Sequence, residues 1–284
     1  MRLIEWTRGY LARAGVDEPR LAGELLLADV LGCPRIRLYA QHDRVVGPEY
    51  LAKFRQAIRR AAGGEPIAYI RGFKEFYSLT FKVTPDVLIP CPETELLVSA
   101  ALEFVRGAGG TVRLWDACTG SGCVAVAAAH YAPGLSVLAT DVSEAALSVA
   151  AENARLHGVA DRVRLAQADL LELPEPLRGE GEFDVITANP PYVSDEEMQV
   201  LSAPVLRQPE MALRAGPTGL EFIQRIVRDA PARLRAGGLL AMEIGMGQAD
   251  AVYQLLAAAG RYQDMRFLKD HAGIPRTAVA QIRP

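Results

Sequence analysis

Four neighbouring residues, Asn189, Pro190, Pro191 and Tyr192, have the types and spacing to hold a nitrogen atom for chemistry. They follow the apolar run 183–188, which predicts a buried strand that ends at this loop. The prolines lack backbone N–H groups and restrict φ, so the loop is stiff and turns carbonyl groups outward. The side-chain oxygen of Asn189 and the carbonyl of Pro190 can accept both hydrogens of a planar NH2 group, with Tyr192 stacked on it. The lone pair of that nitrogen is then free to face a methyl donor.

This loop does not by itself identify the nitrogen. A side-chain amide, adenine N6 and guanine N2 are all planar groups that fit the same pair of acceptors. A turn that only ends a strand is the structural alternative for an Asn-Pro-Pro sequence. Other residues of the chain must decide between these interpretations.

A second set of polar residues lies in the segment 116–122, Asp-Ala-Cys-Thr-Gly-Ser-Gly, where a predicted strand turns into a predicted helix. Glycine has no Cβ, so the backbone of such a loop can approach a ligand closely. Asp141 ends the next predicted strand, where a carboxylate can accept hydrogen bonds from both ribose hydroxyls of an adenosine. Because Gly120 to Ala125 also satisfies the dinucleotide fingerprint, the loop alone leaves NAD and S-adenosylmethionine open.

Asp169 favours S-adenosylmethionine over NAD. It follows the third predicted strand and is placed to meet an adenine amino group, although a turn or capping role explains this residue equally well when it is taken alone. The glycine loop lies one predicted strand away from Asn189, and Asp141 lies between them. This combination predicts methyl transfer. Because a sulfonium methyl group is already activated, orientation supplies most of the rate and no strong base is required.

The elements that must position these residues alternate between strand and helix over the C-terminal two thirds of the chain. Strands are predicted at 112–116, 135–141, 162–166, 183–187, 239–244, 262–268 and 277–282. Helices are predicted at 93–105, 123–130, 143–157, 219–234 and from about residue 248. The pattern predicts a Rossmann-like α/β domain, with a mostly parallel seven-stranded sheet and an antiparallel closing hairpin. In such sheets a ligand lies beyond the carboxyl ends of the strands.

The N-terminal part of the chain has a different character. Apolar residues recur at helical spacing up to about residue 70, whereas aromatic and β-branched residues dominate the stretch that follows. We therefore predict a small all-α N-terminal domain at 1–70, a β-hairpin connector at 71–90 and a catalytic domain at 91–284.

Composition excludes several other classes of protein. The formal net charge of −3 argues against broad capture of a nucleic-acid backbone, which depends on clustered lysine and arginine. Neither the four cysteines nor the histidines show metal-ligand spacing, so no metal site is predicted. The first residues lack the apolar core of a signal peptide, and no uncharged run is long enough to span a bilayer. We expect a soluble cytoplasmic protein.

Further motifs are spread over nearly the whole chain. They are Gly64-Glu65-Pro66-Ile67-Ala68-Tyr69-Ile70-x-Gly72 with Glu75-Phe76, Leu88-Ile89-Pro90-Cys91-Pro92-Glu93-Thr94-Glu95, Gly237-Gly238-Leu239 with Glu243-Ile244-Gly245 and Gly247-Gln248, and Lys269-Asp270 with Gly273 and Arg276. Together with the Asn189 loop, they resemble the release factor glutamine methyltransferase family, also called HemK or PrmC.

This resemblance implies methylation of a glutamine side-chain amide in the Gly-Gly-Gln motif of class 1 peptide chain release factors, giving N5-methylglutamine and S-adenosylhomocysteine. It also implies that the helical N-terminal domain helps to grip the protein substrate. Apart from this resemblance, we expect no direct requirement for nucleic acid, no association with a membrane and a monomeric enzyme. The residues implied to bind the cofactor are Cys118, Thr119, Gly120, Ser121, Gly122, Asp141, Asp169, Leu170 and Asn189. Those implied to bind the amide are Asn189, Pro190, Pro191 and Tyr192, with Asn189, Pro190 and Tyr192 as catalytic residues.

The chain departs from the family pattern at three positions. Cys91 replaces the usual arginine of the Pro-Glu-Thr-Glu signature, Cys118 replaces a common glycine, and Gln208 stands where glutamate is frequent. Cys118 is acceptable if its φ is negative.

Three rival functions remain on the sequence alone. A ribosomal-protein glutamine methyltransferase shares the Asn189 loop but lacks the Pro-Glu-Thr-Glu signature. A DNA adenine methyltransferase also shares the loop, but the chain offers no target-recognition region and no excess of basic over acidic residues. A binding module that has lost activity is disfavoured because Asn189 and Asp141 are intact.

Overall fold

The computed structural model describes residues 2–40, 45–173, 175–179 and 181–284 of the chain. The chain forms two compact units. The first comprises residues up to Phe73 together with Ser202–Arg207, and the second comprises Lys74–Leu201 and Gln208–Pro284. Within the described ranges, no helix is long and apolar enough to cross a membrane.

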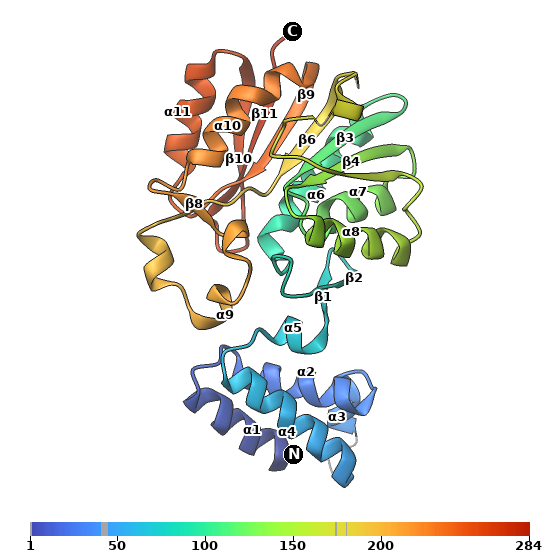
Figure 1. The fold of residues 1–284 in the computed structure, drawn as a ribbon, viewed down its shortest axis with the longest axis vertical. Helices are drawn as coiled ribbons and strands as arrows, with labels where there is room; N and C mark the ends of the chain where they lie inside the picture. Colours follow the sequence, from blue (N-terminus) through green and yellow to red (C-terminus); the bar gives the residue numbers. More distant parts are fainter. Residues whose placement is uncertain (1, 41–44, 174, 180) are drawn as a thin grey trace. The chain divides into compact units, whose positions relative to one another are not determined.

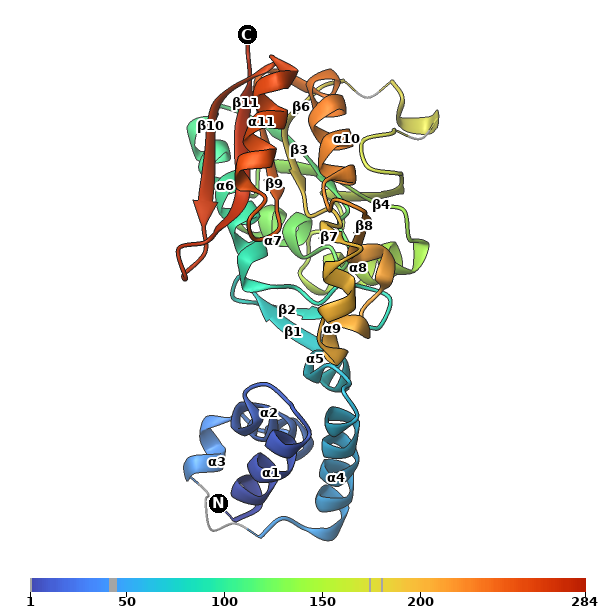
Figure 2. The same cartoon turned by 90° about the vertical axis from the view of Figure 1, so that its left-hand side faces the viewer.

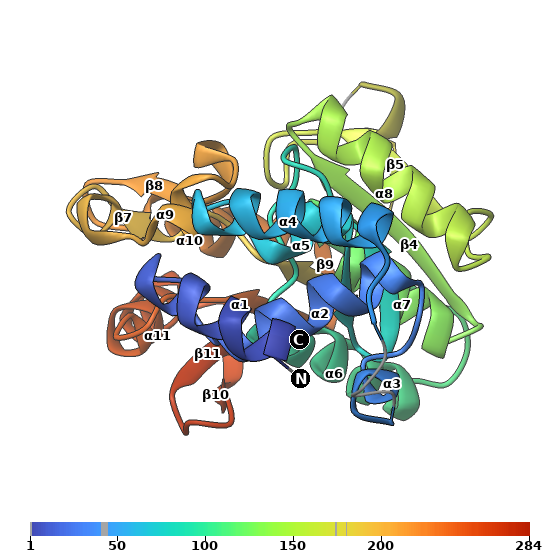
Figure 3. The same ribbon diagram turned by 90° about the horizontal axis from the view of Figure 1, so that it is seen from below.

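The first unit is helical. Its helices are α1 (Arg2–Arg13), α2 (Pro19–Leu31), α3 (Ile36–Ala40), α4 (Pro48–Ala62), α5 (Ile67–Arg71) and α9 (Ala203–Leu206). Figure 3 shows α1, α2 and α4 side by side, and their apolar faces share one cluster that includes Leu11, Leu26 and Phe54. In α4 the buried residues Phe54 and Ile58 are four positions apart, so they project from one face of the helix.

The second unit begins with a short hairpin of β1 (Phe73–Phe76) and β2 (Leu79–Lys82). The two residues between the strands, Tyr77 and Ser78, have φ values of 48° and 61°. Positive φ at both central residues is typical of a type I′ turn, whose twist matches that of the strands it joins.

The main sheet of the second unit has seven strands in the order β10-β11-β9-β6-β3-β4-β5. The strands are β3 (Val112–Ala117), β4 (Leu135–Asp141), β5 (Val163–Gln167), β6 (Phe183–Ala188), β9 (Leu234–Glu243), β10 (Tyr262–Lys269) and β11 (Pro275–Ile282). Strands β5, β4, β3, β6 and β9 are parallel, whereas β11 pairs antiparallel with both β9 and β10. The predicted mostly parallel seven-stranded sheet with an antiparallel closing hairpin is therefore confirmed.

Helices cover both faces of this sheet. They are α6 (Glu95–Gly107), α7 (Cys123–Tyr131), α8 (Glu144–Leu156), α10 (Glu221–Asp229) and α11 (Ala249–Ala259). Residues of α6, α7 and α8 pack into one apolar cluster, and residues of α10 and α11 pack into a second one. Figures 1 and 2 show the two groups of helices on opposite sides of the strands. The sheet is thus buried on both faces, as its apolar strands require.

Two predicted boundaries are wrong. The sequence predicted a helix at 219–234 and a strand at 239–244, but α10 ends at Asp229 and β9 already begins at Leu234. Pro231 explains the early end of the helix, because it has no N–H group with which to continue the helical hydrogen bonds. Leu234 instead pairs with Phe183 of β6 and is buried. Two short paired strands, β7 (Val193–Ser194) and β8 (Arg214–Gly216), were not predicted.

Candidate active site

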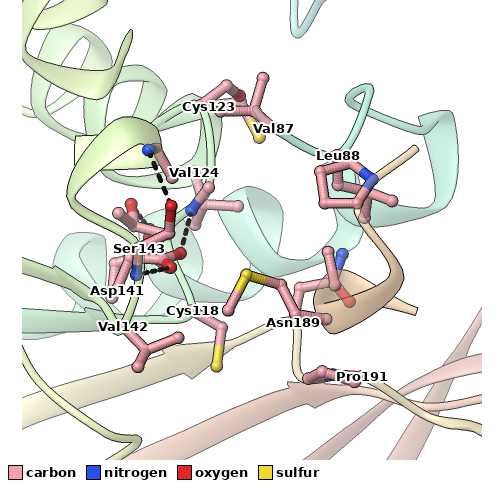
Figure 4. A pocket seen from close by; sticks show the side chains of 18 of the residues that line it. Val87, Leu88, Cys118, Cys123, Val124, Asp141, Val142, Ser143, Asn189 and Pro191 are labelled. Atoms are coloured by element: carbon pink, nitrogen blue, oxygen red, sulfur yellow. Dashed lines mark hydrogen bonds between the residues drawn. The ribbon is translucent and has the colours of Figure 1, made fainter. Parts of the chain in front are cut away.

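A cavity of 420 Å³ opens at the carboxyl ends of the parallel strands, within the second unit. Strand order reverses between β3, whose chain continues to β4 and β5, and β6, whose chain continues to β9. Open α/β sheets bind ligands at this kind of reversal. Figure 4 shows Asp141 and Asn189 on opposite sides of the cavity. The volume lies in the usual range of small-molecule sites, about 300 to 1,000 Å³.

One side of the cavity is lined by residues of the segments 116–122 and 141–143, and these two segments are called the glycine-loop wall. Asp116 at the end of β3 is buried, and its two oxygens accept hydrogen bonds from the hydroxyls of Thr119 at 2.6 Å and Thr187 at 2.7 Å. Burial raises the pKa of the Asp116 carboxyl to about 6, although the two hydroxyls oppose the shift. The Thr119 N–H is held by the carbonyl of Thr140 at 2.9 Å, so the loop is tied to both adjacent strands.

Asp141 connects this loop to the next strand. Its Oδ2 accepts the N–H of Gly120 at 2.9 Å and its Oδ1 accepts the N–H of Ser143 at 2.9 Å, drawn as dashed lines in Figure 4. Burial raises the pKa of the Asp141 carboxyl, and these backbone N–H groups oppose the rise. An ionised carboxylate has about four acceptor positions, so Asp141 can still accept a hydrogen bond from a ligand. Ser143 is the N-cap of α8, since its hydroxyl accepts the N–H of Ala146 at 3.2 Å.

Asp169 lies at the same end of the sheet but has a protein partner. Its Oδ2 accepts a hydrogen bond from Arg225 Nη2 of α10 at 2.7 Å. Arg225 and Phe222 also line the cavity. Sequence reasoning assigned no role to Arg225, because nothing in the spacing of α10 indicates a site.

The opposite side of the cavity is lined by Thr94, Asn189 and Pro191. Together with Pro190, Tyr192, Glu243 and Gln248, which contact them or adjoin them in the chain, these residues are called the Asn189 wall. Asn189 Nδ2 donates a hydrogen bond to Thr94 Oγ1 at 3.2 Å. Thr94 Oγ1 in turn donates to Glu243 Oε2 at 2.6 Å, and both Thr94 and Glu243 are buried. Burial raises the pKa of the Glu243 carboxyl to about 7, although the hydroxyls of Thr94 and Tyr192 oppose the shift.

The end of the loop is fixed by two further contacts. The Tyr192 hydroxyl donates to Glu243 Oε1 at 3.1 Å, and Gln248 Nε2 donates to the carbonyl of Tyr192 at 3.0 Å. Gly219 packs directly against this carbonyl, since an added Cβ there would lie 2.6 Å from the Tyr192 oxygen. Tyr192 is thus held from both its side chain and its backbone.

The structure brings most of the residues named from the sequence to one cavity. Those that line it are Cys118, Thr119, Gly120, Ser121, Asp141, Asp169, Leu170, Asn189 and Pro191. Gly122, Pro190 and Tyr192 are adjacent in the chain but are not among the lining residues. Thr94 and Glu243 stand in motifs that resemble the family, yet only the folded chain reveals that they contact the Asn189 loop.

The three departures from the family pattern have structural consequences. Cys118 adopts a φ of 57°, so the residue that replaces glycine occupies the left-handed region and the condition of a negative φ is not met. Gln208 Oε1 accepts the N–H of Ile89 at 2.9 Å, which a carboxylate oxygen would do equally well. The exposed Cys91 thiol donates to the carbonyl of Ile89 at 3.4 Å.

Comparison with known proteins finds a related family for each of the two units. Residues 2–72 match the PrmC N-terminal domain family, and residues 115–207 match a methyltransferase domain family. A methyltransferase from Pyrococcus furiosus of known structure has a TM-score of 0.53 and 19% identity, and the match covers 81% of this chain and 98% of that one. At this identity the likeness concerns the fold.

Two curated relatives are much closer in sequence. The release factor glutamine methyltransferase of Moorella thermoacetica is 44% identical, over 96% of this chain and 95% of the relative. The release factor glutamine methyltransferase of Rhodopirellula baltica is 40% identical, over 97% of this chain and 94% of the relative. Identity at this level over nearly the full length of both chains establishes kinship, and the chain belongs to the release factor glutamine methyltransferase family.

Proposed function

We propose that this chain transfers a methyl group from S-adenosylmethionine to the side-chain amide nitrogen, N5, of the glutamine in the Gly-Gly-Gln motif of class 1 peptide chain release factors. The observation that carries the proposal is the orientation of Asn189. Its Nδ2 is bound to Thr94 Oγ1, while no described residue donates a hydrogen bond to its Oδ1. The names of the two relatives support a glutamine amide rather than a nucleobase as the acceptor.

The glycine-loop wall fits S-adenosylmethionine. The backbone at Gly120 lies open, since an added Cβ would meet no atom within 4 Å. Asp141, which the backbone N–H groups of Gly120 and Ser143 hold in place, would accept hydrogen bonds from the ribose hydroxyls, and Asp169 with Leu170 would contact the adenine. Cys118, Thr119, Ser121 and Gly122 complete the loop that would hold the methionine part. When bound, the cofactor supplies a methyl group on a positively charged sulfur, which suits a cavity lined by several carboxyl groups.

The Asn189 wall would hold the glutamine amide. Asn189 Oδ1 accepts one amide hydrogen and the Pro190 carbonyl accepts the other, and among the described residues neither oxygen has another donor. As the nitrogen forms its new bond, its N–H groups become more positive, so both acceptors bind more strongly in the transition state. Pro191 and Tyr192 would enclose the flat amide group.

We further propose that the helical domain at 1–70 contacts the release factor and that the enzyme acts as a cytoplasmic monomer. Hydrogen exchange in α1, α2 and α4 should slow when a release factor is added. Unchanged exchange in all three helices would contradict this role.

The test is a labelling reaction with S-adenosylmethionine that carries a radioactive methyl group. We expect the purified enzyme to label a class 1 release factor, and mass spectrometry to locate one added methyl group on the motif glutamine. The matched control is a release factor in which that glutamine is replaced by alanine, which should remain unlabelled.

Ribosomal proteins and duplex DNA belong in the same assay as competing substrates. Labelling of either one in preference to the release factor would contradict the proposed substrate. Labelling of the alanine-substituted release factor would contradict the proposed position.

A further inference from the structure

We propose that Thr94 and Glu243 are positioning residues that fix the side-chain amide of Asn189 with its oxygen towards the acceptor nitrogen. This inference rests on the proposed function, because it explains how the acceptor wall is oriented for that reaction. It concerns a chain of three side chains, Glu243, Thr94 and Asn189, which is called the relay. None of its hydrogen bonds joins residues near in sequence, since 95 residues separate Asn189 from Thr94 and 149 separate Thr94 from Glu243.

The direction of the relay follows from counting donors. A threonine hydroxyl has one hydrogen to give, and Thr94 gives it to Glu243 Oε2 at 2.6 Å. Towards Asn189 the same oxygen can therefore only accept, so it must face the NH2 group of the amide and not its oxygen. The Asn189 oxygen lies in the same amide plane but on the side of the group away from Thr94, where it can accept a hydrogen from the substrate.

The ionised form of Glu243 is essential to this direction. An ionised carboxylate only accepts, and here it receives the hydroxyl hydrogens of both Thr94 and Tyr192. A protonated Glu243 can donate to Thr94, and the Thr94 hydroxyl hydrogen can then turn to Asn189. That hydrogen would favour the reversed amide, which presents NH2 to the substrate and repels its N–H groups.

The surroundings of Glu243 place its ionisation near neutral pH. Burial and the negative charge of Glu93 raise its pKa to about 7, while the hydroxyls of Thr94 and Tyr192 and the charge of Arg276 oppose the rise. The titratable and charged groups that face it are Glu93, Cys91, Cys123, Tyr192 and Arg276. The hydrogen bonds of the relay, and with them the side-chain amide of Asn189, should therefore reverse their direction as pH falls through about 7.

The chain offers a direct probe of the amide, because Asn153 and Asn189 are its only two asparagines. Protein made with asparagine labelled by nitrogen-15 in the side chain should give two NH2 signals, and Asn189→Ala identifies one of them by its loss. Thr94→Val should shift the Asn189 signal. The Asn153 signal should not move, since its NH2 group is bound to the carbonyls of Lys82 and Ser121. In the wild-type protein the chemical shift of the Asn189 signal should change with pH, with a midpoint near pH 7, and Glu243→Gln should abolish that change.

Turnover gives the second measurement. Because a misplacement of about 1 Å can cost about 10²-fold in rate, Thr94→Val should lower kcat about 10²-fold and leave the affinity for S-adenosylmethionine nearly unchanged. Thr94→Ser keeps the hydroxyl and should restore most of the rate. Thr277→Val is the matched control. Thr277 is fully buried and lies opposite Glu243 in the β9–β11 ladder, yet its hydroxyl has no hydrogen-bond partner among the described residues. Its loss should leave kcat unchanged.

The pH dependence separates positioning from simple stabilisation. The kcat of the wild-type enzyme should fall as pH is lowered through 7, and the profile of Glu243→Gln should be flat over the same range. An unshifted Asn189 signal in Thr94→Val, or equal rates in Thr94→Val and Thr94→Ser, would overturn the relay. A wild-type enzyme that methylates no release factor would instead contradict the proposed function, while the two asparagine signals would still decide the relay.

Discussion

The two walls of the cavity are held by different kinds of contact. In the glycine-loop wall, Asp116 binds Thr119 three residues away, and Asp141 binds Ser143 two residues away and Gly120 on the adjacent strand connection. In the Asn189 wall, Asn189 is held by Thr94 and Tyr192 by Glu243, at separations of 95 and 51 residues. Apart from the bond between Asp116 and Thr187, which are 71 residues apart, the glycine-loop wall is assembled within a single strand–loop–helix unit and its neighbour. The other requires three distant parts of the chain to meet.

This difference corresponds to the two tasks that we propose for the walls. A cofactor common to many enzymes can be held by a loop whose own residues fix its shape. A particular acceptor nitrogen needs a side chain with one orientation, which a buried network imposes through donors and acceptors that leave no alternative. Variants that damage one wall should therefore leave the task of the other wall largely intact.

The largest effect is expected from Asn189→Ala. Removal of one of two acceptors for the amide hydrogens should lower kcat about 10²- to 10³-fold, as loss of one group that stabilises developing charge commonly does. Calorimetric titration should show nearly unchanged affinity for S-adenosylmethionine. A variant that turns over normally would refute the acceptor role, and one that no longer binds the cofactor would refute the separation of the two walls.

The pH dependence of stability compares the buried carboxyl of each wall. The folded pKa is about 6 for Asp116 against an ordinary 3.8, and about 7 for Glu243 against an ordinary 4.5. Between those values the native protein binds more protons than the unfolded chain, so the free energy of unfolding falls as pH rises. Each shift corresponds to about 3 kcal/mol at about 1.4 kcal/mol per pKa unit.

Urea unfolding between pH 4 and 8, followed by the fluorescence of the buried Trp115, checks this prediction. Asp116→Asn should reduce the fall in the free energy of unfolding in the lower part of this pH range. Glu243→Gln should reduce it in the upper part. If the free energy of unfolding of both variants depends on pH as that of the wild type does, neither carboxyl has a raised pKa in the folded protein.

A smaller effect is expected from Asp141→Asn, which affects the glycine-loop wall alone. Hydrogen bonds to a charged group contribute about 1.5 to 3 kcal/mol, so the Kd for S-adenosylmethionine should rise about tenfold to a hundredfold. At saturating cofactor, kcat should stay close to that of the wild type. An unaltered Kd would count against the assignment of Asp141 to the ribose.

The smallest effect concerns Cys118, which has a φ of 57°. An L-residue in the left-handed region is strained by about 1 to 2 kcal/mol, so Cys118→Gly should raise the free energy of unfolding by about 1 kcal/mol. Cys118→Ala is the matched control, because it removes the sulfur but keeps the Cβ. Equal stability of the two variants would mean that backbone strain at this position does not limit the stability of the fold.

The sequence allowed much of this architecture to be predicted. Parallel strands bring their carboxyl ends to one edge of a sheet, so Asp141, Asp169 and Asn189 were expected to lie near one another, and all three line the cavity. Periodicity located α7 and β4 within a residue, because their apolar patterns are continuous and their ends carry clear turn signals. The prediction failed around α10 and β9, where helical spacing continued past Pro231 into residues that form a strand.

The sequence by itself determined most of the strand ends, the glycine-rich and proline-stiffened loops that follow two of them and the types of polar group that these loops carry. These properties depend on neighbours along the chain, as in the glycines of residues 116–122 and the two prolines after Asn189. The tertiary structure alone decided which way the Asn189 amide faces and that Glu243 is buried beside it. Those facts depend on a hydroxyl and a carboxyl that approach from distant segments, and no local pattern specifies a hydrogen bond across 149 residues.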